Sequence, residues 1–152
     1  MNDKKIPFPQ ADDFEKIIEI LNVEDEEKLN NKMYLSKLLG NIHERQVAYY
    51  MSAAMYIGVV DTDKKFTEYA KSLRKMSGPV QIAELALRVV SNPIFGRVFF
   101  LEKILDTELD LDDIIEIMKE NNIYFESEAM YKRRAQTVLG WIKWINKIIS
   151  WE

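Results

Sequence analysis

Residues 41–69 read NIHERQVAYYMSAAMYIGVVDTDKKFTEY, and this stretch decides the predicted fold. Its first part repeats small and apolar residues at helical spacing, so we expect a helix from Ile42 to Ile57. Gly58 ends that helix, and two short runs with apolar residues then flank a polar turn. The stretch therefore predicts a helix followed by a small β-hairpin.

Two further helices are expected before this stretch. Apolar residues recur at spacings of three and four from Phe14 to Leu21, behind acidic residues that suit the first turn of a helix. Asn31 is a suitable N-cap for a second helix, which runs to Leu39 and stops at Gly40. Three helices followed by a hairpin is the element order of a winged helix-turn-helix.

A Ser-Gly-Pro break at residues 77–79 divides the chain into two nearly equal halves. We expect a winged-helix domain with an N-terminal surface arm over residues 1–77, and a second helical, winged-helix-like domain over residues 78–152. The second half again contains a series of helical patterns, and its last helix opens near Ser127. The predicted fold class is mainly α with a small β-hairpin, arranged as a tandem winged helix-turn-helix.

Composition excludes several kinds of site. The 152 residues include no cysteine and one histidine, His43, so disulfides, thiolate metal sites and sites that need two imidazoles are excluded. No phosphate-binding loop or dinucleotide-binding glycine pattern is present. We therefore expect no catalytic residues, no cofactor and no metal ion. With no apolar run long enough for a membrane span or a signal peptide, we expect a cytoplasmic protein.

For a nucleic-acid partner, the distribution of charge along the chain is more informative than the net charge of −4. Eight acidic residues lie within residues 12–27 and seven within residues 106–120, which together hold fifteen of the 25 acidic residues. Eighteen of the 21 basic residues lie away from these blocks, because Lys16 and Lys119 are inside them and Lys28 is directly beside one. A basic face is therefore compatible with an acidic protein.

The helix expected at 42–57 occupies the position of a recognition helix. Arg45 can pair with guanine and Gln46 with adenine in the major groove, and Tyr49 can reach phosphate or a thymine methyl group. The alternative is an ordinary amphipathic helix with a polar face, and the neighbouring Glu44 weakens the electrostatic case for DNA.

The expected hairpin carries Lys64 and Lys65 at its tip. A wing in this position can touch the phosphate backbone, which gives these lysines a positioning role without base information. The alternative is an ordinary charged turn.

The last helix contains the densest group of basic residues in the chain. Its candidate DNA-contacting residues are Lys132, Arg133, Arg134, Gln136 and Thr137. In the preferred reading Lys132 and Arg133 meet phosphates, whereas Arg134 and Gln136 meet base edges. Trp141 and Trp144 follow at apolar positions, where we expect them to be core residues.

Two motifs resemble a known family. The sequence around Glu44-Arg45-Gln46, with AAMYIGVV at 53–60 and a Thr-containing hairpin after it, resembles the winged-helix segments of bacterial type II restriction endonucleases. The segment YKRRAQTV at 131–138, with its following tryptophans, is similar to the Arg-Arg-Ala and Trp-rich end of such segments. The resemblance implies tandem winged helices that recognise duplex DNA, with cleavage left to a separate nuclease domain or subunit.

Three functional hypotheses remain open from the sequence. The preferred one is a non-catalytic, sequence-specific duplex DNA-binding module of a restriction or related defence system. The second is a helical protein-docking module whose acidic faces meet basic partners and whose last helix continues into another subunit. The third is a metal-dependent nuclease that uses the two acidic blocks.

Overall fold

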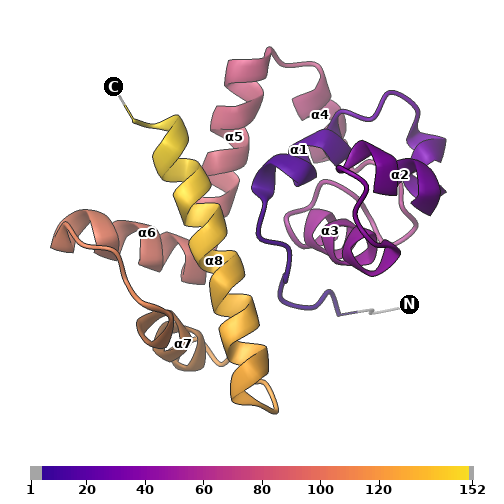
Figure 1. The fold of residues 1–152 in the computed structure, drawn as a ribbon. Coiled ribbons are helices and arrows are strands. Elements are labelled where there is room, and N and C mark those ends of the chain that lie inside the picture. The colour runs from indigo at the N-terminus through magenta and orange to yellow at the C-terminus, as the bar shows by residue number, and fades with distance from the viewer. Residues whose placement is uncertain (1–4, 151–152) are drawn as a thin grey trace.

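The structure is a computed structural model that describes residues 5–150, and it is mainly helical, as predicted (Figure 1). The elements are α1 (Phe14–Leu21), the 3-10 helix η1 (Glu26–Asn30), α2 (Lys32–Leu38), α3 (Glu44–Tyr56), α4 (Glu68–Arg74), α5 (Gly78–Val90), α6 (Pro93–Leu105), α7 (Leu111–Glu120) and α8 (Glu128–Ile148). None of the helices in residues 5–150 combines the length and apolarity needed to cross a membrane.

Helix boundaries follow local signals in the sequence. The side chain of Asn31 accepts a hydrogen bond from the backbone N–H of Tyr34, which confirms it as the N-cap of α2. His43 caps α3, since its Nδ1 accepts from the backbone N–H of Arg45 at 3.0 Å. The single imidazole therefore has a structural role at the start of the candidate recognition helix.

The predicted β-hairpin does not form strands. In the part of the chain that the structure describes, pairing is limited to one antiparallel bridge between Val60 and Phe66. Val59 and Val60 are both buried, so the alternation of a half-exposed strand is missing. Thr67 then caps α4 directly, which leaves no residues to extend the ladder. The segment is a tight loop and not a two-stranded wing.

The apolar core is continuous between the two predicted halves. The ring of Phe14 lies 5.1 Å from that of Trp141 and 4.2 Å from that of Trp144, centroid to centroid. Trp141 also stacks on Phe95 at 4.8 Å. Figure 1 shows α8 crossing the molecule between α1–α4 on one side and α6 and α7 on the other. The tryptophans are confirmed as core residues, and they join residues from both sides of the predicted domain boundary.

From Phe8 onward the N-terminal segment is part of this core, which corrects the expectation of a surface arm for residues 8 and 9, whereas residues 1–4 of the expected arm lie outside the described residues. Phe8 is only 8% exposed, and its ring stacks on that of Phe95 at 5.7 Å. The indole N–H of Trp141 donates a hydrogen bond to the backbone carbonyl of Ala11 at 2.7 Å. Residues 8–13 therefore form a wedge between the first three helices and α8.

The α6 helix has an exposed apolar side that its sequence did not indicate. Phe95 is fully buried, but Phe100 is 55% exposed and Ile104 is 77% exposed. The inward side of this helix is already covered by α5, α7 and α8. The outer side is therefore left to solvent in the described structure.

Candidate nucleic-acid interface

The outward face of α3 carries the three residues predicted for it. Arg45 and Gln46 are exposed and Tyr49 is half-buried, one turn after Arg45. Val47 and Tyr50 face inward, where α1 and α2 both pack on α3. The apolar side of α3 thus holds the helix in the core and turns its polar side outward.

Arg133 of α8 is an anchor for the N-terminal arm. Its Nη1 donates to the carboxylate of Asp12 at 2.6 Å, and its Nη2 donates to the backbone carbonyl of Gln10 at 3.0 Å. These contacts occupy the guanidinium with groups 121 and 123 residues away in sequence. Its predicted role as a free phosphate contact is replaced by a role in fixing the arm.

Thr137 is unavailable to DNA in this structure. Its side chain is 0% exposed, and its hydroxyl donates to the same Asp12 oxygen at 2.8 Å. It lies one turn after Arg133 on the side of α8 that meets the arm. Thr137 is therefore removed from the candidate set. The exposed positions of this helix segment are Lys132 and Gln136, which remain candidates.

Arg134 is half-buried, with its guanidinium carbon 4.7 Å from the centre of the Phe125 ring. Its Nε is buried and has no hydrogen-bond partner in residues 5–150. Burial lowers the pKa of Arg134, and the adjacent charge of Arg133 lowers it further. Of these two adjacent guanidinium groups, Arg133 is therefore held by Asp12, whereas Arg134 lies over the Phe125 ring.

The two lysines of the loop differ in their surroundings. Lys65 forms an exposed ion pair with Glu26, with 3.8 Å between Nζ and Oε1. Lys64 borders a shallow hollow of about 190 Å³, together with Ser52 and Met55 of α3. Lys64 therefore lies beside α3, as a wing residue would, whereas Lys65 pairs with Glu26 of η1.

A second hollow, of about 410 Å³, lies between the outward face of α3 and Arg133 of α8. It lies where α3, α1, the N-terminal arm and α8 meet. The hollow is lined by Gln10, Asp12, Lys16, Ile42, Arg45, Gln46, Tyr49, Tyr50 and Arg133. Three α3 candidates thus share one surface with Arg133 of α8, even though nearly ninety residues separate them along the chain.

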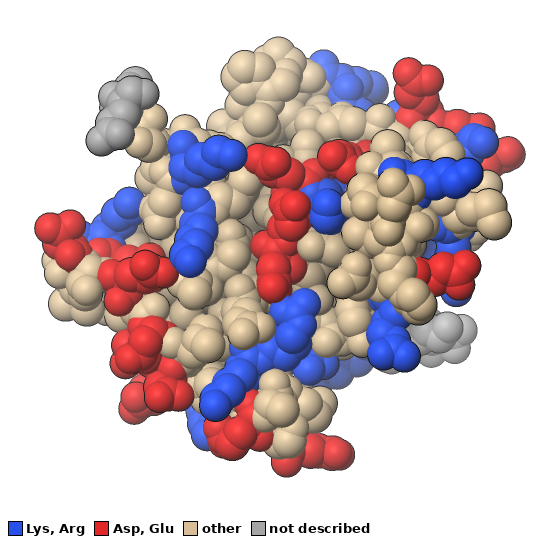
Figure 2. All heavy atoms as spheres, viewed as in Figure 1, with Lys and Arg blue, Asp and Glu red and all other residues tan. Residues whose placement is uncertain are grey.

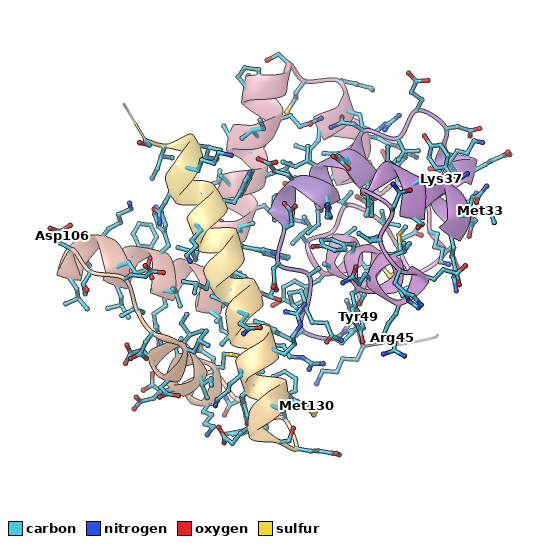
Figure 3. All side chains as sticks on the ribbon, in the orientation of Figure 1. Met33, Lys37, Arg45, Tyr49, Asp106 and Met130 are labelled. Atoms are coloured by element: carbon cyan, nitrogen blue, oxygen red, sulfur yellow. The ribbon has the colours of Figure 1, made fainter. Side chains whose placement is uncertain are left out.

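The figures place this hollow on the molecule. Figure 3 labels Arg45 and Tyr49 below α3 and Met130 near the lower end of α8. Figure 2 shows Lys and Arg side chains gathered over this lower middle region, with a column of acidic side chains directly above them. The basic face is therefore local and has an acidic border.

Sequence reasoning missed Lys16, Gln10 and Asp12 as members of the hollow. Lys16 lies within the acidic block at 12–27, and Gln10 directly follows the segment through Pro9 that was expected on the surface. No spacing signal links either of them to α3 or α8, because both reach the hollow only through tertiary packing. Within residues 5–150, no group of three or more acidic or histidine side chains is placed to hold a metal ion.

Comparison with known proteins gives one match. A family model described as "Domain of unknown function (DUF7226)" matches residues 16–150. No curated protein and no solved structure matches the chain. The match begins inside α1 and extends past the end of α8, so one family model spans both predicted halves.

Proposed function

The chain belongs to the family described as "Domain of unknown function (DUF7226)", and we propose that it is a non-catalytic module that binds duplex DNA through the outward face of α3. The observation that carries this proposal is the shared hollow, which brings Arg45, Gln46 and Tyr49 of α3 next to Arg133 of α8. One surface with basic and amide side chains from both halves suits a duplex, which presents phosphates and base edges together.

A helix-turn-helix assignment supports this role for α3. The α2 and α3 helices are joined by residues 39–43, and α3 packs on both α1 and α2. In such motifs the second helix enters the major groove while the first crosses the backbone. The loop at 59–67 takes the place of a wing. The connections between α5 and α8 contain no β-bridge among the described residues, so the proposal assigns no second winged helix to residues 78–152.

Each exposed candidate has a distinct role in this proposal. Arg45 and Gln46 contact base edges, because a guanidinium and an amide match guanine and adenine in the major groove. Lys132 and Lys64 contact phosphates on either side of α3 and set the position of the duplex. Gln136 lies one helical turn after Lys132 on the exposed side of α8 and contacts the same DNA strand as Lys132. In the restriction-enzyme setting that the sequence resembles, a separate nuclease domain supplies cleavage.

The test is the fluorescence anisotropy of a labelled duplex library at low salt. Arg45→Ala should weaken binding of the preferred sequence by about 1 to 3 kcal/mol, since a bidentate contact to one base is lost. Lys132→Ala should weaken all sequences alike and reduce the salt dependence of binding, because it removes one phosphate contact.

The matched control is Lys147→Ala. Lys147 is also an exposed lysine of α8, but it lies about 22 Å farther along the helix and pairs with Glu15. If Lys147→Ala reduces affinity as much as Lys132→Ala does, binding follows net charge alone and the assigned surface is incorrect. Absence of duplex binding at low salt, with folded protein, contradicts the function itself.

A second candidate function is protein docking, favoured by one specific observation. Leu87 of α5 and Phe100, Ile104 and Leu105 of α6 are all more than half exposed. Groups of exposed apolar residues of this kind commonly mark interaction sites. Trp141 and Trp144 are buried, so this docking candidate uses the exposed side of α6 and not these two tryptophans of α8. Docking would be favoured by two results together. The folded wild-type protein binds no duplex, and the Ile104→Asp variant no longer binds a protein partner that the wild type binds.

A further inference from the structure

The hollow between α3, the arm and α8 is concave, and this shape suits a small ligand or a single protruding group. Its volume of about 410 Å³ lies within the range of small-molecule sites. Side chains from four separate parts of the chain converge on it, and two of its walls are fixed by Arg133 with Asp12 and by Tyr50. The hydroxyl of Tyr50 accepts a hydrogen bond from the backbone N–H of Asp13 at 3.1 Å.

The charge inside the hollow is predominantly positive. Lys16, Arg45 and Arg133 line it, and Asp12 is the single acidic residue among the lining side chains. One Asp12 oxygen already accepts from both Arg133 and Thr137, so this carboxylate is committed to fixing the arm. Arg45 makes no side-chain hydrogen bond or ion pair within residues 5–150. Its guanidinium is therefore available to an anion.

Arg134 follows Arg133 in the sequence but does not line the hollow. Its Nε is buried without a hydrogen-bond partner among the described residues, and the charge of Arg133 acts on it. Lys16 is the other cation on the rim, and its pairing with Asp13 is long, at 3.7 Å, and partly exposed. An anion bound in the hollow would lower the repulsion among these cations. Guanidinium groups bind phosphate particularly well, because they donate two parallel hydrogen bonds.

The remaining wall offers groups that suit an aromatic base. Tyr49 is half-buried and presents a ring at the same hollow, and the amide of Gln46 lies one helical turn away from Tyr50. Tyrosine rings stack on bases, and an amide can pair with a base edge. We propose that this hollow binds a nucleoside 5′-phosphate, with Arg45 and Lys16 at the phosphate and Tyr49 and Gln46 at the base.

This nucleotide can come from two sources with the same chemistry. One is a free nucleoside monophosphate, and the other is the phosphorylated 5′ end of a DNA strand. The strand-end form rests on the proposed DNA function, whereas the free form does not. Both forms use α3, so a free nucleotide in the hollow would compete with a duplex for Arg45.

The test is isothermal titration calorimetry of the full chain with each deoxynucleoside 5′-monophosphate, the matching nucleosides and inorganic phosphate. We expect the monophosphates to bind more tightly than either the nucleosides or phosphate alone. Arg45→Ala should weaken monophosphate binding by about tenfold or more, through loss of a charge-assisted pair. Tyr49→Phe should keep most of the affinity and Tyr49→Ala should lose it, because only the ring is needed for stacking.

The matched control is Arg97→Ala, since Arg97 is an exposed arginine of α6 outside the lining of the hollow. Circular dichroism of every variant establishes that it is folded. The proposal is overturned if wild-type protein binds no monophosphate, if Arg45→Ala binds as well as wild type, or if Tyr49→Ala and wild type have equal affinity.

The two sources are separated with single-stranded oligonucleotides that carry a 5′-phosphate or a 5′-hydroxyl. Preference for the 5′-phosphate supports the strand-end form, and binding of free monophosphate alone supports the free form. Duplex binding measured on the same samples keeps the two proposals apart. Duplex binding without binding of any 5′-phosphate overturns the nucleotide site and leaves the proposed DNA function standing, whereas the reverse result removes the DNA function only.

Discussion

Single residues decide how closely the N-terminal arm and α8 approach each other. A Cβ atom at Gly140 would lie 2.5 Å from the backbone carbonyl oxygen of Asp12. Gly140→Ala should therefore push the arm away from α8 and lower the free energy of unfolding by about 1 to 3 kcal/mol, as overpacking usually does. Urea denaturation measures this. Gly78→Ala is the control, because nothing lies within 4 Å of its added methyl group. Equal stability of Gly140→Ala and wild type would contradict the close approach.

A second residue-scale prediction concerns Glu102, a buried carboxylate of α6 that accepts a hydrogen bond from the backbone N–H of Leu109 at 3.0 Å. Burial raises the pKa of Glu102, so ionisation costs stability in the folded state. The folded state is therefore more stable while the Glu102 carboxyl is protonated, and it loses this part of its stability as pH rises through the raised pKa. Glu102→Gln should therefore raise Tm at neutral pH, and the gain should shrink as pH falls through the raised pKa towards the ordinary glutamate value of about 4.3. The exposed Glu116→Gln is the control. A gain that grows on acidification would contradict the predicted cost of ionisation.

At the scale of elements, the N-terminal arm packs between α3 and α6 through Phe8. The ring of Phe8 lies between Tyr56, at 5.6 Å, and Phe95, at 5.7 Å. Phe8→Ala should cost about 3 kcal/mol of unfolding free energy, since it opens a cavity in the core. Chemical denaturation followed by circular dichroism measures the change. Phe100→Ala is the matched control and should shift stability by no more than about 0.5 kcal/mol, because that ring is exposed. Similar losses in both variants would place the arm outside the core.

At the scale of the whole molecule, the shared aromatic core predicts one cooperative unfolding transition. All three tryptophans lie after residue 140, so their fluorescence reports on the second half, whereas far-UV circular dichroism reports on both. We expect the two probes to give coincident urea curves, since Phe14 contacts Trp141 and Trp144 directly. Two separated transitions would instead support independent domains at 1–77 and 78–152. The predicted boundary therefore has a direct solution test.

Local sequence determined most of the helices. Apolar spacing predicted α1 and α3, and Asn31 predicted where α2 begins. These signals work because a cap or an amphipathic stripe acts within one or two helical turns. The same local reasoning placed Arg45 and Gln46 on an exposed helix face and Trp141 in the core. The loop at 59–67 was misread as a hairpin, since two buried valines satisfy a strand pattern without any partner strand.

Only the tertiary structure decided what the polar residues of α8 and the arm do. Thr137 and Arg133 belong to a basic, polar sequence that looks exposed, yet both bind Asp12, which is more than 120 residues away. The same packing buries Phe8 and brings Lys16 to the hollow beside Arg45. Helical periodicity describes neighbours along one helix, and it carries no information about which distant segment covers each face. For this reason the sequence determined the helices and the exposed face of α3, whereas long-range packing decided the hollow and which basic residues remain free to bind.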